Sequence, residues 1–165
     1  MIGRLGLDKE SDGRAPTAKE MSDYRSSLAK RRPAYYGRVA GYFASPATRS
    51  TDAQGRTLFH FAAMPKETVM VGDTDLSDHV AGDVLVDTSG NTPFLSEVRF
   101  HSTTPTRVKL IAKIDRFATT PRYRLLPYGK PVPMEFESEM SGSLLGKSGT
   151  IRTRITFSDY RRAGK

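Results

Sequence analysis

The chain has 165 residues and a net charge of +8, with 37% hydrophobic residues and no cysteine. That length suits one domain, because a domain of about 150 residues buries roughly 70% of the surface of its unfolded chain. The lack of cysteine excludes disulfide scaffolds, thiol nucleophiles and Cys-based zinc sites. The positive charge raises the question of a nucleic-acid or anionic-lipid partner.

The basic charge is concentrated at the two ends of the chain. Residues 1–50 carry a net charge of +5, residues 51–100 a net charge of −5 and residues 101–165 a net charge of +8. Many basic residues alternate onto the solvent side of expected strands, so we expect a cationic polar face that suits an anionic surface or membrane. Nucleic acid is the less favoured partner, because most aromatic residues fall on the apolar side of those strands.

The first part of the chain predicts a flexible segment followed by one helix. Glycines and a proline are scattered among charged residues in 1–16, as in loose segments. Thr17 and Glu20 then match a capping box, and apolar residues follow at helical spacing. Pro33 cannot continue a helix. We therefore expect a helix at about 18–31.

After this helix the pattern changes to about eight strands separated by short turns. Apolar and polar residues alternate in them, which indicates a sheet with one buried and one solvated face. No helical pattern separates the strands, so an antiparallel meander is favoured over a parallel sheet. The fold class is α+β and mainly β, with the helix packed on a large antiparallel sheet in a single domain of residues 17–162 and a tail at 163–165. The expected strands are 34–44, 56–63, 82–88, 93–102, 107–115, 117–126, 133–141 and 150–158.

One hairpin can be placed in register from the sequence. If residues 142–149 turn it, Glu139 faces Arg152 and Glu137 faces Arg154 across neighbouring strands. We interpret this charge ladder as support for the solvated face rather than as a site. Exposed ion pairs of this kind contribute about 0–1 kcal/mol each.

The apolar sides of several strands carry Phe, Met and Val rather than a uniform filling of Ile and Val. Flexible methionine side chains can line an adaptable apolar cavity. The alternative is that the helix at 18–31 packs against these residues and fills the space. The cavity candidates are Phe94, Val98, Phe100, Val108, Leu110, Met134, Phe136 and Met140.

Hard ligands gather in one acidic segment, residues 72–79. Its first three candidate ligands match the start of a calcium-binding loop, but the glycine and the final glutamate of that loop are missing. A loop in which Asp and Ser cap backbone groups is the favoured interpretation. We expect no catalytic residue, no metal and no cofactor. A hydrolase or metal enzyme stays as a third hypothesis, with Asp73, Asp75, Asp78 and His79 as its residues.

Five short motifs between residues 56 and 162 form one pattern: AGDVLVD at 81–87, EVRF at 97–100, GKPVP at 129–133, SGSLLG at 141–146 and FSDYR at 157–161. In this pattern the chain resembles the bacterial outer-membrane lipoprotein-sorting family, the lipoprotein carriers. The resemblance implies a strongly curved, unclosed antiparallel sheet, a half-barrel, with a helix on its concave side. It also implies a non-catalytic protein that holds acyl chains in the periplasm or cell envelope.

The N-terminus lacks the uninterrupted apolar stretch of a signal peptide, so a cytoplasmic location also stays open. No stretch has the length of a membrane span, and we expect a soluble protein or the soluble part of a longer one. The leading hypothesis is a non-catalytic module that binds a lipid or other apolar ligand in the concavity of its sheet. The alternative is a basic module that binds nucleic acid or another anionic partner.

Overall fold

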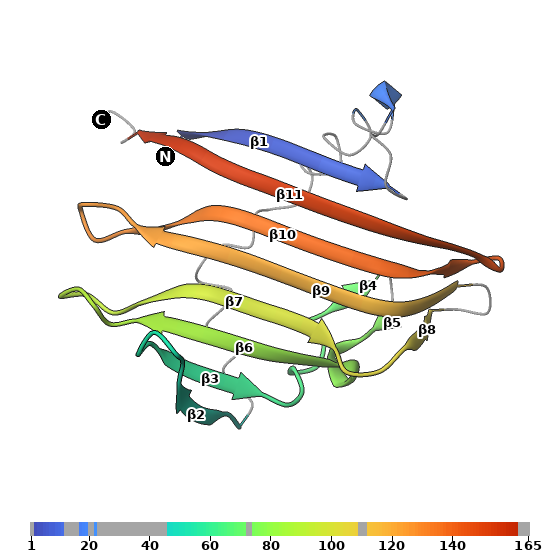
Figure 1. Ribbon diagram of the computed structural model, residues 1–165, viewed down its shortest axis with the longest axis horizontal. Helices are drawn as coiled ribbons and strands as arrows, with labels where there is room; N and C mark the ends of the chain where they lie inside the picture. Colours follow the sequence, from blue (N-terminus) through green and yellow to red (C-terminus); the bar gives the residue numbers. More distant parts are fainter. Residues whose placement is uncertain are drawn as a thin grey trace.

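The fold is seen in a computed structural model of the chain (Figure 1). The structure describes residues 2–11, 17–19, 22, 46–71, 74–108 and 112–161. The helix expected at 18–31 lies almost entirely outside these residues, and the strand expected at 34–44 lies wholly outside them. In the part of the chain that the structure describes, the fold is mainly β, as predicted, and the helical part of the α+β prediction finds no support.

Nine of the described strands form one open, curved antiparallel sheet with β1 and β2 at its edges (Figure 1). The order is β1-β11-β10-β9-β7-β6-β3-β2, and β8 pairs with β9. A second small sheet pairs β4 with β5. The predicted antiparallel architecture is therefore confirmed. The strands are β1 Ile2–Ser11, β2 Thr48–Thr51, β3 Thr57–Phe61, β4 Met70–Val71, β5 Thr74–Asp75, β6 Val80–Asp87, β7 Phe94–Ser102, β8 Thr106–Val108, β9 Ala112–Leu125, β10 Pro131–Leu144 and β11 Lys147–Arg161, and the 3-10 helix η2 is Ser77–His79.

The longest elements are β9, β10 and β11, with 14, 14 and 15 residues. The register of β9 and β10 shifts twice, between Pro133 and Glu135 and between Ser141 and Gly142. Such bulges bend a strand and increase its twist. They are one physical source of the curvature of this end of the sheet.

A two-residue turn, Leu145-Gly146, closes the hairpin of β10 and β11. Both residues have positive φ, 51° and 78°, which is the requirement of a type I′ turn. Such turns favour Asn-Gly, because a non-glycine residue in the left-handed region costs about 1–2 kcal/mol and Asn tolerates it best. Leucine at this position is therefore unfavourable for the turn itself.

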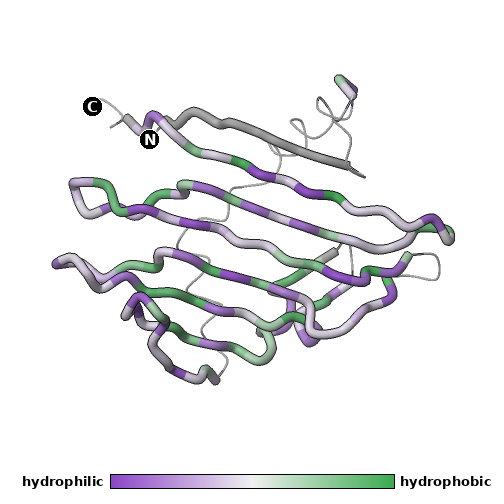
Figure 2. The backbone as a smooth tube through the Cα atoms, viewed as in Figure 1, coloured by the Kyte–Doolittle hydropathy of each residue, from purple (hydrophilic) through white to green (hydrophobic). Residues whose placement is uncertain are grey.

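Apolar and polar residues alternate along the strands (Figure 2), so the sheet has two distinct faces. We call the face that carries Val84, Val98 and Met140 the apolar face. The opposite, polar face carries Glu97 and Arg122, which pair across β7 and β9.

The hydrophobic core lies on the apolar face over β3, β6 and β7. Phe61, Val84 and Val98 are each at most 2% exposed. The segment between β3 and β6 folds over them and contributes Met64 and Leu76, which are 4% and 3% exposed. Met64 packs tightly against β6, since a Cβ added to Gly82 would lie 2.9 Å from Met64 Sδ.

The N-terminal segment and the strand expected at 107–115 differ from the sequence predictions. Residues 1–16 were expected to be flexible, but Ile2–Ser11 forms β1, which pairs along β11 with Leu5 opposite Phe157. The reason is that β11 offers a long edge, so a segment with little strand pattern of its own gains backbone hydrogen bonds there. The strand expected at 107–115 is divided between β8 and β9, which pair with each other.

Candidate functional site

An apolar groove of about 570 Å³ lies at the end of the sheet where β8, β9, β10 and β11 meet. It continues the apolar face beyond the core. Its walls come from aliphatic side chains, with glycines and serines between them. The lining residues are Val108, Ala112, Lys113, Ile114, Met140, Ser141, Gly142, Ser143, Leu144, Leu145, Lys147, Ser148, Gly149, Thr150 and Ile151.

The register of β9 and β10 makes glycine necessary on one side of this groove. Ser141 pairs with Arg116, but Gly142 pairs with Ile114, so β9 has one extra residue at this point. The strands approach so closely that a Cβ on Gly142 would lie 2.1 Å from the carbonyl oxygen of Lys113. Only glycine permits this backbone contact.

Five of the eight cavity candidates belong to one hydrophobic cluster. Val98, Phe100 and Val108 are 0%, 9% and 8% exposed, and Phe94 and Met140 pack against them. Of these five, only Val108 and Met140 also line the groove. The other three lie where the core is filled, so the open space begins further along the sheet than the candidates suggest.

Of the remaining three candidates, the two that the structure describes, Met134 and Phe136, do not line the groove. Met134 lies at the first bulge of β10 and is 39% exposed. Phe136 is half-buried on β10, opposite Pro121 and Ile155. Leu110 lies outside the described residues.

Sequence reasoning missed four of the larger aliphatic residues of the groove: Ile114, Leu144, Leu145 and Ile151. The two leucines were assigned to a loop at 142–149, whereas β10 and β11 continue through most of it. Two adjacent leucines in a Gly/Ser-rich turn were the signal that could have found them. Leu144 and Leu145 are 57% and 71% exposed, and Ile151 is 45% exposed.

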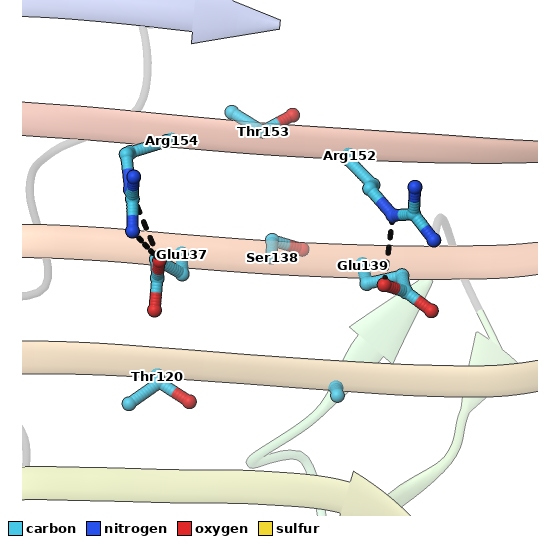
Figure 3. A pocket seen from close by; sticks show the side chains of 8 residues that line it. Thr120, Glu137, Ser138, Glu139, Arg152, Thr153 and Arg154 are labelled. Atoms are coloured by element: carbon cyan, nitrogen blue, oxygen red, sulfur yellow. Dashed lines mark hydrogen bonds and ion pairs between the residues drawn. The ribbon is translucent and has the colours of Figure 1, made fainter. Parts of the chain in front are cut away.

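The polar face carries a second groove of about 490 Å³, lined by the charge ladder of β10 and β11 (Figure 3). Glu139 faces Arg152 and Glu137 faces Arg154, as predicted. Arg152 Nε donates to Glu139 at 2.9 Å, and Arg154 is hydrogen-bonded and ion-paired with Glu137. The predicted register is therefore confirmed.

Arg122 on β9 joins this ladder to β7. Its guanidinium donates to Glu137 at 2.6 Å, to Glu135 at 2.7 Å and to Glu97 at 3.1 Å. Partial burial lowers the pKa of Arg122, but these hydrogen bonds outweigh it and raise the pKa above its usual value. Hydrogen bonds from Arg122 in turn lower the pKa of Glu137. Both groups stay charged at neutral pH.

The ion pairs of the polar face balance one another. Arg99 pairs with Glu97, and Arg154 also reaches Glu135 at 2.9 Å. The network thus joins four arginines to four glutamates: Arg99, Arg122, Arg152 and Arg154 with Glu97, Glu135, Glu137 and Glu139. The eight side chains of this network therefore sum to no net charge, and a phosphate at the arginines would also lie close to the glutamates.

The acidic segment forms a structural loop in its described part. Asp75 accepts hydrogen bonds from the hydroxyl and backbone N–H of Ser77 and from the N–H of Glu67, and these lower its pKa. His79 Nδ1 lies 3.1 Å from the Thr104 hydroxyl. Asp73 lies outside the described residues. Among the residues that are described, no three His, Asp or Glu side chains gather as a metal site.

No protein-family model, curated protein or solved structure matches the chain. The resemblance to lipoprotein carriers therefore stays a prediction. Within the described ranges, no helix has both the length and the apolar character that crossing a membrane requires.

Proposed function

We propose that the chain is a non-catalytic module that holds an apolar ligand, such as a lipid acyl chain, in the groove beside Val108, Met140 and Ile151. The observation that carries this proposal is an open apolar groove on a curved sheet whose core is otherwise filled. Its volume of about 570 Å³ is within the range of about 300–1,000 Å³ that is typical of small-molecule sites.

The chemistry of the lining supports a ligand with a long apolar part. Ile114 and Met140 lie at the inner side, next to the core cluster, and a methionine can adapt to ligands of different shape. Two exposed lysines, Lys113 and Lys147, are the charged residues of the lining. A carboxylate or phosphate head at the end of an acyl chain would find a cation there.

The likeness to lipoprotein carriers agrees with this proposal, because a half-barrel that binds acyl chains needs an open, curved antiparallel sheet. On the same likeness we propose that the protein is located in the periplasm or cell envelope. The competing nucleic-acid hypothesis has less support, since the arginines of the polar face are held by glutamates.

Titration with a fluorescent fatty-acid probe tests the proposed function. Ile151→Glu places a carboxylate in the groove wall, and we expect it to weaken binding at least about tenfold, since burial of one such side chain is worth about 1.5–3 kcal/mol. Met70→Glu is the matched control, because Met70 and Ile151 are both 45% exposed strand residues and Met70 does not line the groove. A wild-type protein without a saturable signal, or equal affinity in both variants, would contradict the proposal.

A further inference from the structure

We propose that the tip of the β10–β11 hairpin, Leu144, Leu145 and Lys147, docks the protein on an anionic lipid bilayer. Leu144 and Leu145 are 57% and 71% exposed and are the two most exposed large hydrophobic side chains of the described residues. They are consecutive residues, Leu144 at the end of β10 and Leu145 in the turn that leads to β11, and this hairpin is the longest of the described sheet (Figure 1).

The backbone at the tip shows that leucine is not there for the turn. Leu145 has φ 51° and Gly146 has φ 78°, a conformation in which Asn-Gly is the favoured pair. Leucine therefore adds conformational strain and also exposes apolar surface to water. Both costs are recovered if Leu145 enters an apolar environment that only a partner supplies.

Charge around the tip identifies the partner as an anionic surface. We define the tip region as β8 with residues 112–116 and 141–150. Its only carboxylate is that of Asp115, which pairs with Lys113 at 2.6 Å. Its cations are Arg107, Lys113, Arg116 and Lys147, all exposed. Leucines that insert at an interface, ringed by cations, are the pattern of proteins that bind anionic bilayers.

The position of the tip connects this surface to the groove. Leu144 and Leu145 line the groove as well as the tip. A docked tip would therefore place the groove against the acyl layer, where a chain could pass between bilayer and protein without crossing water. This last step rests on the proposed function, whereas docking itself does not.

Co-sedimentation with vesicles tests the inference. We expect binding to vesicles of equal parts phosphatidylcholine and phosphatidylglycerol, and far weaker binding to phosphatidylcholine alone. Leu145→Asn should reduce binding at least about tenfold while its melting temperature stays equal or rises, because asparagine suits the turn. Leu145→Gly is a second variant that also fits positive φ. Lys147→Gln should weaken binding about fivefold, the factor expected for one cation near an anionic surface.

The matched control is Tyr128→Asn, since Tyr128 is 45% exposed in the hairpin turn at the opposite end of the sheet (Figure 1). We expect it to bind vesicles as the wild type does. Wild-type binding by both Leu145 variants, equal binding to both kinds of vesicle, or no binding to either would overturn the inference. A wild-type protein that binds fatty acid but does not bind the anionic vesicles overturns docking alone, and a wild-type protein that binds the anionic vesicles but no fatty acid overturns the proposed function alone.

Discussion

Replacing Gly142 by alanine tests the backbone geometry on which the groove depends. The added Cβ would lie 2.1 Å from the carbonyl oxygen of Lys113 and 3.2 Å from the Cα of Ile114. Ordinary contacts of this kind are about 3.4 Å or longer, so β9 and β10 must separate by more than 1 Å at this point. Backbone atoms cannot rotate away as a side chain can.

The size of the effect follows from this overlap. Overpacking in a well-packed structure costs about 1–3 kcal/mol, and each backbone hydrogen bond lost as the strands part adds about 1 kcal/mol. We expect Gly142→Ala to lower the free energy of unfolding by about 3 kcal/mol. For a domain of this size, that corresponds to a decrease of about 6–12 °C in the melting temperature.

The assay is urea denaturation and thermal unfolding of Gly142→Ala beside Gly90→Ala. Gly90 has no atom within 4 Å of an added Cβ and no positive φ. Its alanine variant should be neutral or up to about 1 kcal/mol more stable. Equal stability of the two variants would refute the close approach of β9 and β10 at the bulge, and with it the geometry of the groove.

Two further predictions concern the segment over the core and the ion network. Ser77 is 1% exposed, and its hydroxyl accepts from the N–H groups of Thr68 and Val69. Ser77→Ala should therefore lower the free energy of unfolding by about 2–3 kcal/mol, as measured by urea denaturation. The control is Ser89→Ala at an exposed position, which should change this free energy by less than about 0.5 kcal/mol. Similar effects of the two substitutions would be inconsistent with a buried role for Ser77. The pKa of Glu137 is lowered from its ordinary value of 4.5, chiefly by the hydrogen bond from Arg122. The ionised Glu137 therefore stabilises the folded protein above pH 4.5, and this contribution is lost as the pH falls through the pKa of Glu137 in the folded state. Urea denaturation across this acidic range should show a shallower loss of stability for Glu137→Gln than for the wild type, and identical slopes would mean that the ion pairs do not contribute.

The sheet and one register were predictable because their signals are local. Alternation along 133–141 and 150–158 assigns Glu137, Glu139, Arg152 and Arg154 to one side, and a single hairpin then aligns them. Side chains alternate between the two faces of a strand, so a shift of the pairing by one residue would move every side chain to the wrong face. The predicted register is therefore the one that the structure shows.

β1 and the groove were not predictable in the same way. Leu5 and Leu7 sit among glycines and charges, and they form a strand only because the edge of β11 is available. The groove depends on a bulge at residues 141–142 that adds one residue on β9 and leaves no mark in an alternating pattern. The candidates Val98 and Phe100 were correctly placed on the apolar side, but the sequence could not show that Met64 folds over them.

The most direct test of the central claim is to observe where an acyl chain lies on the protein. Intermolecular NOEs between ¹³C-labelled palmitate and the methyl groups of the chain provide that measurement. If the fatty acid lies in the groove, we expect NOEs from it to Ile114, Met140 and Ile151, and none to Met70. Contacts elsewhere on the sheet, or the absence of any contact at saturating palmitate, would contradict the account.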